Sequence, residues 1–190
     1  MTSQKTQSKT INSDTLLSFL LTVIFTSSPA LVSKIKAQTL TEASSVGIRG
    51  IEPIKIGMTI QEARRTAKTE LIQVTSGGEP SCLYYKAKSL KDVSFMVTDG
   101  RISRIDINNP RVTTLSGAKI GDSETKIKAL YPQRIQVKPH KYLQNGRYLV
   151  FLPKDREDKN YGIVFETDGK KVTRWRVGKF PEVEWVEGCA

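Results

Sequence analysis

The chain is 190 residues long, 38% hydrophobic and 26% charged, and carries a formal net charge of +11 at pH 7. This composition is ordinary for a globular protein and excludes a chain that is disordered throughout. The length allows one domain, or two half-sized units that share a core. The basic excess favours anionic partners such as anionic lipid, cell-wall polymer or an acidic protein, with solubility alone as the alternative.

Residues 1–37 predict a secretory signal peptide, with a basic start, a short apolar run at 16–25 and an exit of small residues. The run is too short for a membrane-spanning helix, which needs about 20 apolar residues. Small residues fit cleavage after Ala37, which we favour, or after Ala30; an uncleaved hydrophobic anchor is the alternative. We therefore expect a bacterial protein exported to the periplasm or beyond, with residues 38–46 as a flexible mature N-terminus and no transmembrane span after processing.

Three short motifs in the mature part of the chain each occur twice, in the same order. Because this order is hard to obtain by chance, we predict two tandem repeats, over residues 47–110 and 113–180, and a C-terminal tail at 181–190. The paired motifs are 55–59 with 119–123, 71–74 with 134–137, and 98–107 with 167–177.

Each repeat begins with a helix-start signal. In the first repeat Thr59 is a helix N-cap, and Glu62, three residues later, completes a capping box. In the second repeat Ser123 is the cap and Pro132 ends the helix. The signals predict one short helical segment in each repeat.

Two Asp-Gly pairs, at 99–100 and 168–169, lie between β-rich runs and predict hairpin turns. After each turn apolar and polar residues alternate, so one face of the strand is expected in the core. The fold class that follows is α+β, with two tandem repeats, each a short helical segment packed on a three- to four-stranded antiparallel sheet. The residues predicted to face inward are Ile105, Ile107, Trp175 and Val177, and those predicted to face outward are Arg104, Asp106, Arg174 and Arg176.

The chain has two cysteines, Cys82 and Cys189. An even count in an exported chain predicts a disulfide, with two buried free thiols as the alternative. The bridge would join the first repeat to the tail that follows the second.

The helix-start sequence contains Gly57, Met58 and Thr59. This Gly-Met-Thr motif resembles that of two related groups. One group is the small lipoproteins of the bacterial outer-membrane assembly machine, and the other is the secreted β-lactamase inhibitor protein family, which carries the motif in tandem repeats. A second pattern, residues 100–106 followed by 117–121, resembles an uncharacterised envelope-stress lipoprotein family.

Together the resemblances cover most of residues 47–190 and imply helices packed against one face of an antiparallel sheet. The inhibitor family also implies a concave sheet surface that grips a loop of another protein. Two features depart from these families: Asp122 stands where the second motif would have methionine, and the lipid-anchor cysteine of the lipoproteins has no counterpart. Since fold does not transfer function, no target-contacting residue is carried over.

Catalytic machinery is not indicated. His140 is the single histidine, and the chain has no Gly-x-Ser-x-Gly, His-Glu-x-x-His or Walker glycine loop. We predict no enzyme activity, no cofactor and no metal site. Arg104, Arg174 and Arg176 instead mark a basic sheet face, and arginine is enriched at interface hot spots; an ordinary solvated face is the alternative.

The sequence thus predicts an exported, non-enzymatic binding module that presents this sheet face to a protein or an anionic envelope ligand. Nucleic acid is not an expected partner, because the chain has no recognition motif for it. The alternatives are a structural envelope protein that supports cell-surface assembly and a hydrolase that acts through carboxylates.

Overall fold

A computed structural model describes residues 39–74 and 81–189. The predicted signal peptide, with both cleavage positions, Ala30 and Ala37, lies outside the described residues. Within the described part of the chain, no helix has both the length and the apolar character needed to span a membrane.

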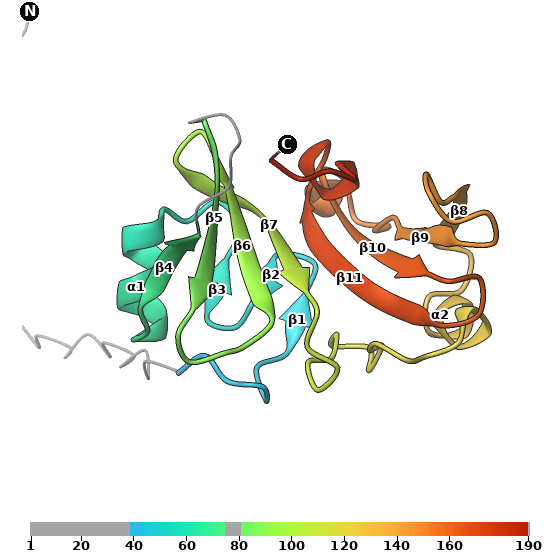
Figure 1. Cartoon of the computed structure of the whole chain (residues 1–190), viewed down its shortest axis with the longest axis horizontal. Coiled ribbons are helices and arrows are strands. Elements are labelled where there is room, and N and C mark those ends of the chain that lie inside the picture. The colour runs from blue at the N-terminus through green and yellow to red at the C-terminus, as the bar shows by residue number, and fades with distance from the viewer. Residues whose placement is uncertain (1–38, 75–80, 190) are drawn as a thin grey trace, which may run out of the picture. The chain divides into compact units, whose positions relative to one another are not determined.

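The largest element of the fold is an eight-stranded sheet (Figure 1), in which every neighbouring pair of strands is antiparallel. The strand order is β4-β5-β6-β7-β11-β10-β9-β8, so the chain fills the sheet from one edge to the centre and then from the other edge to the centre. The strands are β4 (Leu71–Val74), β5 (Cys82–Ala87), β6 (Val93–Thr98), β7 (Arg101–Ile107), β8 (Ile135–Pro139), β9 (Arg147–Phe151), β10 (Tyr161–Thr167) and β11 (Val172–Lys179).

The remaining elements are short. A three-stranded antiparallel sheet has the order β1-β2-β3, and the helical segments are single α-helices or turns of 3-10 helix. Their bounds are β1 (Val46–Gly47), β2 (Gly50–Ile51), β3 (Ile54–Lys55), α1 (Ile60–Ala67), α2 (Glu124–Leu130), η1 (Arg156–Asp158) and η2 (Glu182–Glu184).

The main hydrophobic core combines large side chains of the eight-stranded sheet, such as Phe95, with side chains of the small sheet and of both α-helices. The four residues predicted to face inward, Ile105, Ile107, Trp175 and Val177, are all buried in it, which confirms the predicted alternation. Burying one large aliphatic or aromatic side chain contributes about 1.5–3 kcal/mol, so this face of the sheet supplies much of the fold's stability.

Both predicted helix starts are confirmed. The Oγ1 atom of Thr59 accepts a hydrogen bond from the backbone amide of Glu62 at 3.2 Å, and the Glu62 carboxylate accepts one from the amide of Thr59 at 2.8 Å. Ser123 caps α2 by accepting a hydrogen bond from the third helical amide at 3.1 Å, and α2 ends before Pro132.

Both predicted hairpins are also confirmed. Asp99 and Gly100 connect β6 to β7 with φ angles of 51° and 74°, and two positive φ angles are what a two-residue type I′ turn requires. In the hairpin between β10 and β11, Gly169 has a φ of 95°, and the carboxylate of Asp168 accepts hydrogen bonds of 2.8 Å from two following backbone amides.

The predicted fold class, α+β with two helix-on-sheet repeats, is wrong. Residues 39–74 and 81–189 are mostly β, with an eight-stranded and a three-stranded sheet and two short α-helices of eight and seven residues. The prediction placed each half of the chain in its own sheet, but β7 of the first half pairs with β11 of the second, so that the two halves form one sheet. The paired residues run from Ile107 opposite Trp175 to Arg104 opposite Gly178. This pairing satisfies backbone amides and carbonyls that two separate sheets would leave at open edges.

Candidate functional site

The face of the large sheet opposite the core carries polar side chains at its centre. Lys86, Ser94, Asp106 and Arg176 are successive cross-strand neighbours on β5, β6, β7 and β11. Because side chains alternate along a strand, these residues and those two positions away share one face. We refer to this surface as the polar face.

The C-terminal segment 180–189, called the strap from here on, lies on the polar face. A disulfide between Cys82 and Cys189 joins the end of the strap to β5, with the two Cα atoms 5.4 Å apart, which confirms the predicted disulfide. Gly188 lies against the ring of Tyr84 with a φ of 70°, and a Cβ atom at this position would come within 2.5 Å of the tyrosine hydroxyl. The strap is therefore held close to the sheet by a covalent bond and by a close approach that requires glycine.

Arg104 binds the strap from β7. Its Nη1 atom donates hydrogen bonds to the carbonyl oxygens of Glu182 at 2.9 Å and of Trp185 at 2.6 Å. Its Nε donates to the carboxylate of Asp106 at 3.0 Å and its Nη2 to the hydroxyl of Tyr84 at 2.8 Å. All three nitrogen atoms of the guanidinium thus donate hydrogen bonds.

Arg176 binds the strap from β11, with Nε donating to the carbonyl oxygen of Val183 at 2.6 Å. Its Nη1 atom lies 3.3 Å from Glu166, a residue of β10 whose side chain is 6% exposed. The same carboxylate forms an ion pair with the guanidinium of Arg174 at 2.8 Å and accepts a hydrogen bond from Nε2 of His140 at 3.0 Å. Because Nδ1 of His140 accepts hydrogen bonds from two backbone amides, the ring proton is assigned to Nε2.

The charge states of Glu166 and Tyr84 are set by their surroundings. Burial raises the pKa of Glu166, but the hydrogen bonds from Arg174 and His140 and the nearby guanidinium charges outweigh it and hold the pKa below its ordinary value. Burial, with help from the charge of Asp106, raises the pKa of Tyr84 to about 12. Near neutral pH Glu166 is therefore ionised and Tyr84 protonated.

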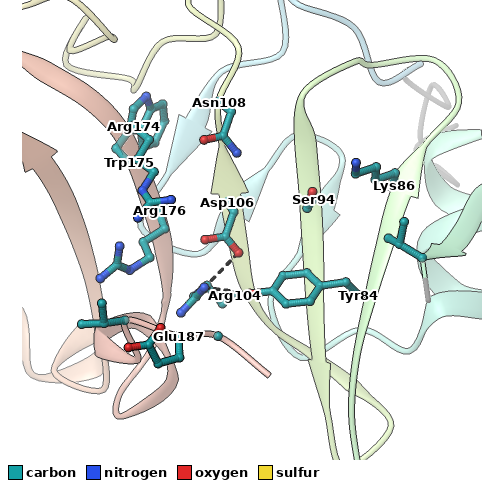
Figure 2. A pocket seen from close by; sticks show the side chains of 13 residues that line it. Tyr84, Lys86, Ser94, Arg104, Asp106, Asn108, Arg174, Trp175, Arg176 and Glu187 are labelled. Atoms are coloured by element: carbon teal, nitrogen blue, oxygen red, sulfur yellow. Dashed lines mark hydrogen bonds and ion pairs between the residues drawn. The ribbon is translucent and has the colours of Figure 1, made fainter. Parts of the chain in front are cut away.

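A cavity of about 370 Å³ opens between the strap and strands β5, β7 and β11 (Figure 2). Four basic and two acidic side chains line it, which gives the lining a net charge of +2. Lys86 is exposed and the side chain of Arg174 is 51% exposed, and Figure 2 shows these two residues on opposite sides of Asp106. The charged lining residues are Lys86, Arg104, Asp106, Arg174, Arg176 and Glu187.

The structure brings the three arginines of the sequence prediction together at this cavity. Arg174 is exposed, as expected for an outward sheet face, whereas Arg104 and Arg176 are each 4% exposed and bind the strap. The difference arises because the strap folds back over the polar face and covers Arg104 on β7 and Arg176 on β11. A ligand-binding role for the three arginines stays a prediction.

Several members of the site, among them Lys86, Glu166 and His140, were not singled out from the sequence as site residues. Lys86 stands two positions after Tyr84 on one strand, and this spacing alone places both side chains on the same face. Glu166 and His140 form a buried pair across β10 and the end of β8, and no local sequence signal points to such a long-range contact.

Among residues 39–74 and 81–189, no three His, Cys, Asp or Glu side chains gather in a way that could hold a metal ion.

Comparisons with known proteins do not assign the chain to a family. A scan against protein-family models finds no match, and a search of curated proteins finds none. Among solved structures, the chain is similar to the uncharacterized protein yfeY from Escherichia coli, with a TM-score of 0.41 and 14% identity, over 72% of this chain and 99% of that one. A likeness at this level carries no conclusion about function, and the family resemblances of the Gly-Met-Thr motif stay predictions.

Proposed function

We propose that the protein is exported and acts as a non-enzymatic binding module that takes an anionic ligand in the cavity on its polar face. The observation that carries this proposal is the pair of accessible cations, Lys86 and Arg174, on either side of a cavity with a net positive lining. The buried ion pairs and the strap hold the surrounding side chains in place before a ligand arrives, which lowers the entropy cost of binding.

The disulfide supports export. Disulfides form and persist in oxidising compartments such as the periplasm or the extracellular space, and they are rare in the cytosol. The Cys82–Cys189 bond is therefore consistent with the signal peptide expected at residues 1–37.

The environment of the carboxylates favours binding over hydrolysis. A hydrolase that acts through two carboxylates needs one of them protonated, with a raised pKa, to act as the general acid. Asp106 and Glu166 both accept hydrogen bonds from guanidinium groups, and the pKa of Glu166 is lowered. Both groups serve to position the arginines.

The proposal is tested by titrating the oxidised mature chain with three defined anions, namely inorganic phosphate, tripolyphosphate and polyglutamate. We expect at least one of them to bind, more weakly at high salt. The double variant Lys86→Gln/Arg174→Gln should bind it about tenfold more weakly, since two exposed ion pairs are lost. The matched control, Lys119→Gln/Lys128→Gln, removes the same charge from exposed positions near α2 and should bind like the wild type. If none of the three anions binds, or if both variants lose affinity equally, the cavity is not an anion site.

A further inference from the structure

The strap is itself an acidic segment bound on the polar face. It carries three glutamates, and each contacts a side chain of the large sheet or of the loop after β8. Glu184 pairs with Lys138, Glu187 pairs with Lys141 at 2.8 Å, and Glu182 accepts a hydrogen bond from the hydroxyl of Thr98 at 3.2 Å.

The polar face also recognises the backbone of the strap. Arg104 and Arg176 direct guanidinium donors at the carbonyl oxygens of three strap residues, at 2.6 to 2.9 Å. Main-chain carbonyls are present in any peptide and absent from phosphate polymers. The combination of carbonyl and carboxylate recognition is therefore specific to acidic polypeptide.

The cavity beside the strap presents the same kinds of group. Arg174 and Lys86 offer cationic donors, Asn108 an amide and Ser94 a hydroxyl, and Asp106 offers an acceptor for a backbone amide. Lys86 and Arg174 stand on β5 and β11, which are separated by β6 and β7. Three strand spacings are about 14 Å, and Arg174 stands two positions along β11 from Arg176, the residue in register with Lys86, which adds about 7 Å along the strand. The two Cα atoms are thus about 16 Å apart, and the long side chains of Lys86 and Arg174 can reach carboxylates of an extended peptide that are four positions, or about 14 Å, apart.

We infer that the cavity recognises an acidic, extended peptide segment of a partner protein, lying beside the strap with two carboxylates at Lys86 and Arg174. This inference rests on the proposed function, and it narrows the ligand from any anion to a polypeptide. The strap forms one wall of the site and shows, within the same chain, how the polar face binds an acidic segment.

The experiment measures dissociation constants of the full mature, oxidised chain for three blocked peptides. The first has two glutamates four positions apart in an otherwise uncharged extended sequence, the second has glutamines in their place, and the third has the two glutamates adjacent. Inorganic phosphate and tripolyphosphate are titrated in parallel. We expect the first peptide to bind most tightly, the adjacent-glutamate peptide several-fold more weakly, and the glutamine peptide about tenfold more weakly.

The double variant Lys86→Gln/Arg174→Gln should bind the first and second peptides about equally, while Lys119→Gln/Lys128→Gln keeps the preference for glutamate. Equal affinity of the wild type for all three peptides would overturn the inference. So would tripolyphosphate binding that depends on Lys86 and Arg174 without peptide binding, and in that case the proposed anion site would stand. If neither peptide nor phosphate binds, both proposals fail together.

Discussion

The Nε atom of Arg176 donates a 2.6 Å hydrogen bond to the carbonyl oxygen of Val183, seven residues further along the chain. The chain therefore turns back after β11, and the strap lies over the strand that it has just left. Because Arg176 is 4% exposed, the bond is shielded from water, and loss of the guanidinium would leave the Val183 carbonyl and part of the Glu166 carboxylate without a donor.

Replacing Arg176 should therefore destabilise the protein far more than replacing its exposed neighbour Arg174. We expect Arg176→Ala to lower the free energy of unfolding by about 3–5 kcal/mol, the usual cost of removing one partner of a buried ion pair. Arg174→Ala, at a half-exposed position, should cost about 1 kcal/mol or less. Urea unfolding followed by fluorescence measures both, and equal losses would contradict the structural role assigned to Arg176.

The disulfide should contribute strongly to stability. The two cysteines are 107 residues apart in the sequence, and in the chain-entropy model a loop of this size contributes about 4.7 kcal/mol. The variant Cys82→Ser/Cys189→Ser should lose stability of this order in urea unfolding. Reductant should weaken the wild type by a similar amount and leave the serine variant unchanged, whereas sensitivity of the serine variant to reductant would exclude the disulfide as the cause.

Glu166 should make stability depend on pH in the acid range. Its pKa is lower in the folded protein than in the unfolded chain, so the unfolded state takes up the proton first and acid favours unfolding. The contribution of Glu166 is fully present above the pKa of an ordinary glutamate, about 4.3, and is lost as the pH falls through the folded pKa. The difference in unfolding free energy between wild type and Glu166→Gln should thus be largest at neutral pH and shrink below about pH 4.

The matched control for this prediction is Glu157→Gln, at a side chain that is 92% exposed. Urea unfolding of the three proteins between neutral and acid pH gives the comparison. A difference between wild type and Glu166→Gln that stays constant across this range would show that Glu166 does not titrate as the structure indicates.

Gly178 should be essential at the junction between β7 and β11. It pairs with Arg104, and a Cβ atom at residue 178 would lie 2.7 Å from the carbonyl oxygen of Ser103 and 3.0 Å from the Cα of Arg104. Since backbone atoms cannot move aside easily, Gly178→Ala should cost about 1–3 kcal/mol. Thermal unfolding measures this cost. Gly146→Ala, at a second crowded glycine outside the junction, gives the cost of crowding elsewhere in the fold for comparison. An unchanged melting temperature for Gly178→Ala would contradict the claim that the close approach of β7 and β11 at this position requires glycine.

Local features of this fold were predictable from the sequence because each depends on residues close together in the chain. The cap formed by Thr59 and Glu62 spans three positions, and the turn at Asp99 and Gly100 spans two. The inward direction of Trp175 follows from strict alternation in its strand.

Long-range features were not predictable. The pairing of Ile107 with Trp175 unites the strands in one sheet. It is formed by backbone amides and carbonyls, and because these groups are the same in every strand, the sequence does not show which strands pair. The burial of Arg104 depends on a strap that reaches it from 78 residues away. Alternation placed Arg104 on the correct face, but it could not show that another part of the chain covers that face.

The bond between Cys82 and Cys189 has a mechanical consequence. Force applied between residue 39 and Cys189 would pass through the disulfide and bypass the whole chain between the two cysteines. Strands β6 to β11 would carry no load, and only the segment from residue 39 to Cys82 could be drawn out. Its full extension is about 150 Å, so a molecule stretched between two surfaces would lengthen by a short, fixed distance while most of its large sheet stayed folded.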